Sequence, residues 1–163
     1  MKRIIPAFLI LSLLLGLCGC KDHSGGEEIS YYYPRAEYQY NSADSILAPE
    51  ARETNGVYVA AELLQTYFQG PLDPLFTNPF PAKLKLVSIY NDSTTVYITV
   101  SDEMAKLSGA PLIIACASLG KTAMDMTGTT EANIQCQSLL LDGKKAIVIN
   151  DETVLYLDNT STD

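Results

Sequence analysis

The stretch from Leu84 to Met126 constrains the fold most, because its pattern of apolar residues changes period within one continuous run. Leu84 to Tyr90 and Thr95 to Ser101 are rich in the β-branched and aromatic residues that favour strands. The four residues between them, Asn91 to Thr94, are typical of a turn. This order predicts a β-hairpin.

The second strand of this hairpin has two different faces. Val96, Ile98 and Val100 fall on one face, which we expect to be buried, and the residues between them fall on a wetter face. After the strand the period becomes helical, and Pro111 suits the first turn of a helix. The apolar positions of this predicted helix are Leu112, Ala115, Cys116, Leu119 and Ala123.

Three more segments show strand or helix signals. Ile29 to Pro34 alternates as an aromatic strand, and a short extended piece, Ile46 to Pro49, follows it. Val57 to Phe68 has apolar residues at helical spacing and is followed by the helix-stopping pair Gly70-Pro71. Ala132 to Cys136 alternates as a further core strand.

The C-terminal part predicts a closing hairpin. Ala146 to Asn150 and Thr153 to Leu157 are apolar runs on either side of Asp151-Glu152, and Asp142-Gly143 is a tight-turn signal upstream. Together these elements predict an α+β fold: a small mixed sheet with two helices packed on one face, plus flanking β-hairpins.

The composition argues against several classes of function. The chain has 163 residues, enough for one domain after a targeting segment, and a formal net charge of -8. The acidic balance disfavours nucleic acid as a partner. His23 is the only histidine, which leaves little to build a Ser-His-Asp site or a histidine-rich metal site. We therefore expect no enzymatic activity and no cofactor.

The N-terminus has the organisation of a bacterial lipoprotein signal. Residues 1–3 are a short basic start, and residues 4–17 are an apolar run too short for a comfortable membrane span. Leu17 to Cys20 fits a lipobox in which Cys20 is lipidated, whereas Cys18 fits less well because Leu17 directly precedes it. A diacylglycerol on Cys20 supplies the two acyl chains that stable anchoring needs. An ordinary cleaved signal and a transmembrane anchor are the alternatives.

The sequence thus divides into four predicted parts. Residues 1–19 form a lipoprotein signal peptide, residues 20–28 a lipidated tether, residues 29–157 one domain, and residues 158–163 a disordered tail. We expect the protein at the cell membrane, on its extracytoplasmic face, held by the lipid on Cys20.

Two sets of residues are candidate sites. Five tyrosines near the start of the domain could stack on a cell-wall glycan or peptide, or they could pack sideways onto the domain from an edge strand; they are Tyr31, Tyr32, Tyr33, Tyr38 and Tyr40. Cys116 and Cys136 could form a disulfide in an exported protein, or they could be free thiols at apolar positions.

The order of elements resembles a GerMN domain, a module of a bacterial sporulation and germination protein. The matching features, in series, are Gly70-Pro71 after the first helix, Pro81 before the hairpin, the strand from Val96 to Ser101, the apolar helix from Ala110 to Ala123, and the strand from Asn133 to Gln137 leading to Asp142-Gly143. The segments 31–34 and 47–53 resemble a strand pair that often precedes the module. The chain departs from the family at Pro81-Ala82-Lys83, where a glycine usually follows the proline, and in carrying one copy of the module.

This resemblance implies a fold similar to the ring-building modules of envelope-spanning assemblies, which associate through their surfaces and carry out no chemistry. It implies a scaffolding or interaction module with a protein partner or a second copy, linked to sporulation or germination. The alternative is a ligand-binding lipoprotein that uses the tyrosine-rich surface.

Overall fold

The structure, a computed structural model, describes residues 27–37, 45–54 and 59–158. These residues form an α+β fold, which confirms the predicted class. The elements, in chain order, are β1 (Glu27–Pro34), β2 (Leu47–Thr54), α2 (Ala60–Tyr67), β3 (Leu86–Asn91), β4 (Thr95–Val100), the 3-10 helix η1 (Asp102–Lys106), α3 (Gly109–Thr127), β5 (Glu131–Cys136), β6 (Ile147–Asn150) and α4 (Asp151–Asp158). Strand β1 begins two residues before the predicted start of the domain.

The strands form two separate sheets. Strands β1 and β2 pair as an antiparallel hairpin, and the other four form one sheet in the order β3-β4-β5-β6. The predicted hairpin is present as β3 and β4, and β6 is antiparallel to β5. Strands β4 and β5 are parallel, so the chain must cross the sheet between them, and η1 and α3 make that crossing.

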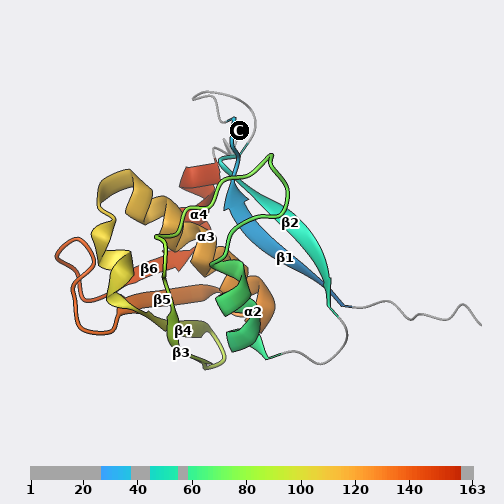
Figure 1. The fold of residues 1–163 in the computed structure, drawn as a ribbon. Helices are drawn as coiled ribbons and strands as arrows, with labels where there is room; N and C mark the ends of the chain where they lie inside the picture. The colour runs from blue at the N-terminus through green and yellow to red at the C-terminus, as the bar shows by residue number, and fades with distance from the viewer. Residues whose placement is uncertain (1–26, 38–44, 55–58, 159–163) are drawn as a thin grey trace, which may run out of the picture.

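Helix α3 lies at the centre of the molecule, between the four-stranded sheet and the β1–β2 hairpin (Figure 1). It touches β4, β5 and β6 on one side and β1 on another, which is why it is buried around most of its circumference. A Cβ atom on Gly120 would lie 2.9 Å from the Ile149 side chain, so helix and sheet approach closely there. On the other side, the Tyr32 amide donates to Thr122 Oγ1 at 2.9 Å.

The predicted closing hairpin is wrong in its second half. Thr153 to Leu157 belongs to helix α4, not to a strand. Asn150 caps this helix, since its Oδ1 accepts hydrogen bonds from the amide and the hydroxyl of Thr153 at 3.0 and 2.9 Å. Asp151 and Glu152 then lie in the first turn, where negative charge favours a helix. The Asn-Asp-Glu-Thr sequence is therefore the start of a helix and not the turn of a hairpin.

Two non-glycine residues of the described chain, Lys83 and Asp142, have left-handed backbone, and each lies in a turn. At Asp142-Gly143 both residues have positive φ, 50° and 77°, and Leu141 and Lys144 exchange hydrogen bonds of 2.8 and 2.9 Å, as the predicted tight turn requires. Before β3, the Leu84 amide donates to Pro81 O at 3.2 Å and Lys83 has φ of 69°. Lys83 thus adopts a conformation that glycine accepts more easily, one residue after Ala82, where the resemblance leads us to expect a glycine.

Candidate interaction surfaces

Three tyrosines from distant parts of the chain form a buried tyrosine cluster, which consists of Tyr31, Tyr33 and Tyr67. Tyr31 is 2% exposed and the other two are fully buried. The Tyr67 ring lies 5.3 Å from the Tyr31 ring and 4.7 Å from the Tyr33 ring, measured between centroids. The predicted ligand surface is therefore corrected at Tyr31 and Tyr33, because a ring enclosed by the core has no face to offer a ligand.

Hydrogen bonds fix the hydroxyls of this cluster. Tyr33 Oη donates to Tyr67 O at 2.9 Å, and Tyr67 Oη donates to Tyr32 O. Burial raises the pKa of both hydroxyls well above their ordinary range. Tyr32 points to the other face of β1, is half-buried, and has Lys121 Nζ 5.0 Å from its ring centroid. Tyr38 and Tyr40 lie outside the described residues.

An ion pair on β2 holds the loop that follows α2. Glu50 pairs with Arg52, and Glu50 Oε2 accepts the amides of Leu72 and Asp73 at 2.9 and 3.2 Å. Arg52 donates to Gly70 O at 3.0 Å and lies 4.7 Å above the Tyr31 ring. Every one of these contacts is internal, so the two charges tie β2 to the loop.

Cys116 and Cys136, the possible disulfide pair, are free thiols in the structure. Both are buried, as the alternative interpretation required. Burial, with a smaller effect from the nearby Cys136, raises the pKa of the Cys116 thiol to about 12. The Cys136 Sγ donates to Ser101 O at 3.7 Å, and burial raises its pKa as well. Thiols with raised pKa values react slowly.

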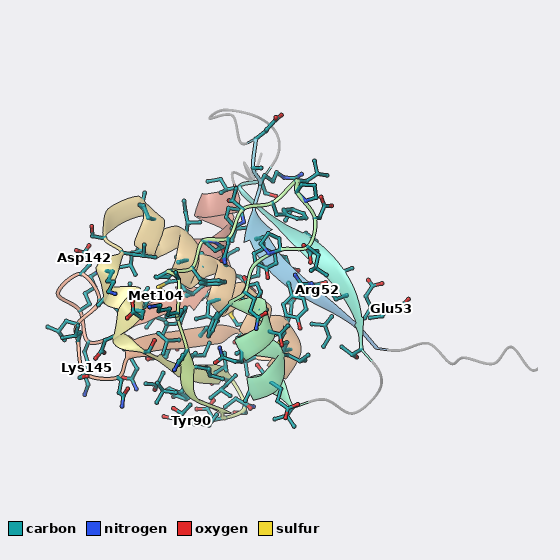
Figure 2. All side chains as sticks on the ribbon, viewed as in Figure 1. Arg52, Glu53, Tyr90, Met104, Asp142 and Lys145 are labelled. Carbon is teal, nitrogen blue, oxygen red and sulfur yellow. The ribbon has the colours of Figure 1, made fainter. Side chains whose placement is uncertain are left out.

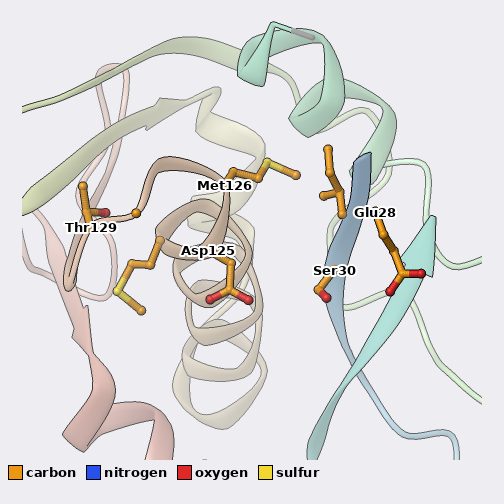
Figure 3. Close-up of a pocket in the computed structure, with 8 residues that line it drawn as sticks. Glu28, Ser30, Asp125, Met126 and Thr129 are labelled. Atoms are coloured by element: carbon orange, nitrogen blue, oxygen red, sulfur yellow. The ribbon is translucent and has the colours of Figure 1, made fainter. Parts of the chain in front are cut away.

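A hollow of about 480 Å³ lies between β1 and the C-terminal end of α3 (Figure 3). Glu28 and Asp125 are two carboxylates among its lining residues. In the part of the chain that the structure describes, no cluster of three or more His, Cys, Asp and Glu side chains could hold a metal ion.

The face of the four-stranded sheet that points away from α3 carries a set of residues that we call the open sheet face. The strand register brings its members side by side in two rows; they are Ser88, Thr99 and Gln135, and Tyr90, Tyr97 and Asn133. Tyr90 is 60% exposed, and its ring stacks on that of Tyr97 with centroids 4.8 Å apart and planes 11° apart. Figure 2 shows Tyr90 at the β3 side of the molecule, far from Arg52 on β2. The alternation in β4 indicated this wetter face, but the tyrosine pair was missed.

A second surface, the edge groove, lies between α2 and β3 and encloses about 560 Å³. It is lined by Ala61, Glu62, Gln65 and Thr66 from α2 and by Leu86, Val87, Ser88 and Ile89 from β3. Strand β3 is at one end of the sheet order, and Val87 is 46% exposed. The Leu86 amide donates to Gln65 Oε1 at 3.0 Å, which ties the helix to the strand edge.

The predicted lipidation residue, Cys20, lies outside the described residues, as does His23. Among residues 27–37, 45–54 and 59–158, no helix is both long and apolar enough to cross a membrane.

The fold is similar to that of solved GerMN domains. The tandem GerMN domains of the sporulation protein GerM from Bacillus subtilis match with a TM-score of 0.58 and 12% identity, over 85% of this chain and 50% of that one. The first GerMN domain of the same protein matches with a TM-score of 0.56 and 12% identity, over 77% of this chain and 96% of that one. The chain thus has the fold of GerMN domains, as the sequence resemblance implied.

A third structure, "Putative Lipoprotein from Clostridium perfringens", is 18% identical over 82% of this chain and 93% of that one. Its TM-score is 0.47, which is too low to establish a shared fold. No protein-family model matches the sequence, and no curated protein matches it either.

Proposed function

We propose that this chain is a lipid-anchored protein of the extracytoplasmic membrane face, whose GerMN-like domain is a protein-interaction module without catalytic activity, used in sporulation or germination. The observation that carries the proposal is the fold, which is shared with the GerMN domains of a sporulation protein. The chemistry of the described residues is consistent with it, since the two cysteines are buried and the Glu50 and Arg52 charges are used internally.

The edge groove is the surface that suits a protein partner best. An edge strand presents backbone groups to which a strand from another chain can add. Val87 offers an exposed apolar side chain beside that edge, and Gln65 and Thr66 supply polar groups from α2. A partner strand along β3, or the same surface of a second copy, would extend the four-stranded sheet.

Site-specific photocrosslinking in cells tests this interface. A photoreactive residue at Val87 should give a defined crosslinked product with a partner or a second copy, and the additional change Thr66→Lys, on the helix side of the groove, should reduce its yield. The matched control is Leu72, which is 79% exposed but lies in the loop beside β2. Equal crosslinking from both positions, or none from Val87, would count against an interaction module that uses β3.

The lipid anchor has a separate test. Cys20→Ala should abolish incorporation of a labelled fatty acid and release the protein from the membrane fraction, because the thioether to diacylglycerol can no longer form. Cys18→Ala is the matched control and should leave lipidation unchanged. If Cys18→Ala lost the label and Cys20→Ala kept it, Cys18 would be the lipidated residue instead of Cys20.

A further inference from the structure

We propose that the open sheet face binds an uncharged glycan chain of N-acetylated amino sugars. The face combines an exposed aromatic stack with neutral hydrogen-bonding groups. The stack is Tyr90 on Tyr97, and the neutral groups belong to Thr99, Asn133 and Gln135 on the two central strands.

The tyrosine pair supplies the apolar contact that a sugar needs. The ring carbons of a pyranose carry hydrogens that give the sugar an apolar face, and a tyrosine ring offers a flat apolar surface with a polar tip. Tyr90 remains 60% exposed although it stacks on Tyr97, so part of its ring is accessible. In this respect the pair differs from the buried tyrosine cluster.

The neighbouring side chains match the polar groups of an amino sugar. Asn133 and Gln135 each carry an amide that donates and accepts, as hydroxyl and acetamido groups require. The Gln135 amide nitrogen donates to Thr99 Oγ1 at 3.1 Å, which fixes its orientation while its carbonyl oxygen points in another direction. A few placed polar groups around an apolar contact are the usual composition of a ligand site.

The charge of the face selects against anionic ligands. Tyr97 Oη donates to the Asp92 carboxylate at 3.2 Å, and Glu131 lies beside Thr95 on the same side of the sheet. None of the six residues of the open sheet face is cationic, and the chain carries a net charge of -8. At this end of the face, beside Asp92 and Glu131, a phosphate- or carboxylate-rich polymer would meet repulsion, whereas an uncharged glycan would not.

The site is preformed and long enough for an oligosaccharide. The three strands that carry its six residues span about 10 Å across the sheet. Beyond Thr99 and Gln135, at the end away from Asp92, the face continues into a hollow of about 490 Å³ that Leu139, Leu140 and Lys145 help to line. Asp102 fixes this end, since its carboxylate accepts the amides of Ser138 and Leu139 at 2.9 and 3.1 Å. A rigid site loses little conformational freedom on binding.

An NMR titration tests the proposal. The full chain, isotope-labelled and held in phosphocholine micelles that carry no sugar headgroup, is titrated with chitotetraose, an uncharged N-acetylglucosamine oligomer. Amide shifts should move on β3, β4 and β5 and stay constant on β2. Tyr90→Ala should weaken the affinity by about tenfold, because a stacking contact is lost, and Tyr90→Phe should retain it.

Two controls distinguish a glycan site from nonspecific binding. Leu72→Ala changes an exposed apolar residue that lies outside the open sheet face, so it should leave the affinity for chitotetraose unchanged. A hyaluronan oligomer of similar length should bind much more weakly because it carries carboxylates. Unmoved amide shifts on the open sheet face, equal binding of hyaluronan, or full affinity of Tyr90→Ala would overturn the proposal. Crosslinking at Val87 does not depend on sugar. A negative titration would therefore overturn the glycan site alone, and absent crosslinking would count against the interaction module alone.

Discussion

Tyrosines occupy two regions of this molecule in opposite ways. In the buried tyrosine cluster, Tyr31, Tyr33 and Tyr67 are enclosed by α3 and by the loop that follows α2, and the hydroxyls of Tyr33 and Tyr67 donate to backbone oxygens. In the exposed pair, Tyr90 and Tyr97 stack on each other on the sheet face that points away from α3, and Tyr90 is 60% exposed. The same residue type is a core element in one region and a surface element in the other.

The difference shows that local sequence does not decide what a tyrosine does. The Tyr31-Tyr32-Tyr33 run is the more conspicuous aromatic stretch, yet two of its three rings are core. Tyr90 and Tyr97 are separated in sequence and become neighbours only through the hairpin register. Which face of a strand is covered is set by the packing of α3, and that is a property of the whole fold.

The largest expected contrast is in stability. Tyr67→Ala should lower the free energy of unfolding by about 4 kcal/mol, since a fully buried aromatic ring leaves a cavity. Tyr90→Ala, the matched change in the exposed pair, should cost about 1 kcal/mol or less, the worth of a cross-strand pair. Urea denaturation of both variants measures the difference. Similar costs would mean that the two regions are equally part of the core.

The ion pair beside the buried cluster should have the next largest effect. Arg52→Met should destabilise by about 2–3 kcal/mol, because Glu50 keeps its two amide partners but loses its cation in a buried position. Glu53→Gln, on the exposed face of the same strand, is the control and should change little. Thermal unfolding followed by circular dichroism measures both, and an unaffected Arg52→Met would show that the pair does not hold the loop.

The buried cluster should make the fold sensitive to alkali. The pKa of Tyr67 is raised by burial, so the folded state disfavours the phenolate. Stability should be complete below about pH 10 and fall as the pH rises further, by up to about 1.4 kcal/mol per pH unit for Tyr67. Urea midpoints across this range measure the slope. Tyr67→Phe should make it shallower, and an unchanged slope would assign the effect to other groups.

The smallest expected effect lies at the turn beside the exposed pair. The amides of Thr94 and Thr95, and then the Tyr97 hydroxyl, lower the pKa of Asp92 by hydrogen bonding to its carboxylate. The stabilisation of the turn by the Asp92 carboxylate is therefore fully present above about pH 4, and it is lost as the pH falls through the lowered pKa of Asp92. Amide shifts of Thr94 and Thr95 should titrate with that midpoint in NMR spectra, and Asp92→Asn should remove the titration.

Periodicity in the sequence was sufficient for much of the fold. The predicted hairpin from Leu84 to Ser101 and the helix after it are present, and Val96, Ile98, Val100, Leu112, Cys116 and Leu119 are all fully buried as predicted. These segments are long and strongly patterned, so local preference and burial agree. The short apolar run after Asp151 was wrongly predicted as a strand. A run this short is compatible with a strand and with a helix, and the hydrogen bond from the Thr153 amide to Asn150 Oδ1 favours the helix.

The sequence by itself determined most of the element types, the apolar face of each strand and the acidic, histidine-poor chemistry. Only the tertiary structure decided which faces are covered. Helix α3 crosses from β4 to parallel β5, packs on one face of the sheet, and takes the β1–β2 hairpin on its other side. This arrangement buries Tyr31 and Tyr33 and leaves Tyr90 exposed. Contacts between residues far apart in sequence produce it. The alternation in β4 indicated the wetter face of that strand, but no local pattern placed Tyr90 against Tyr97 there.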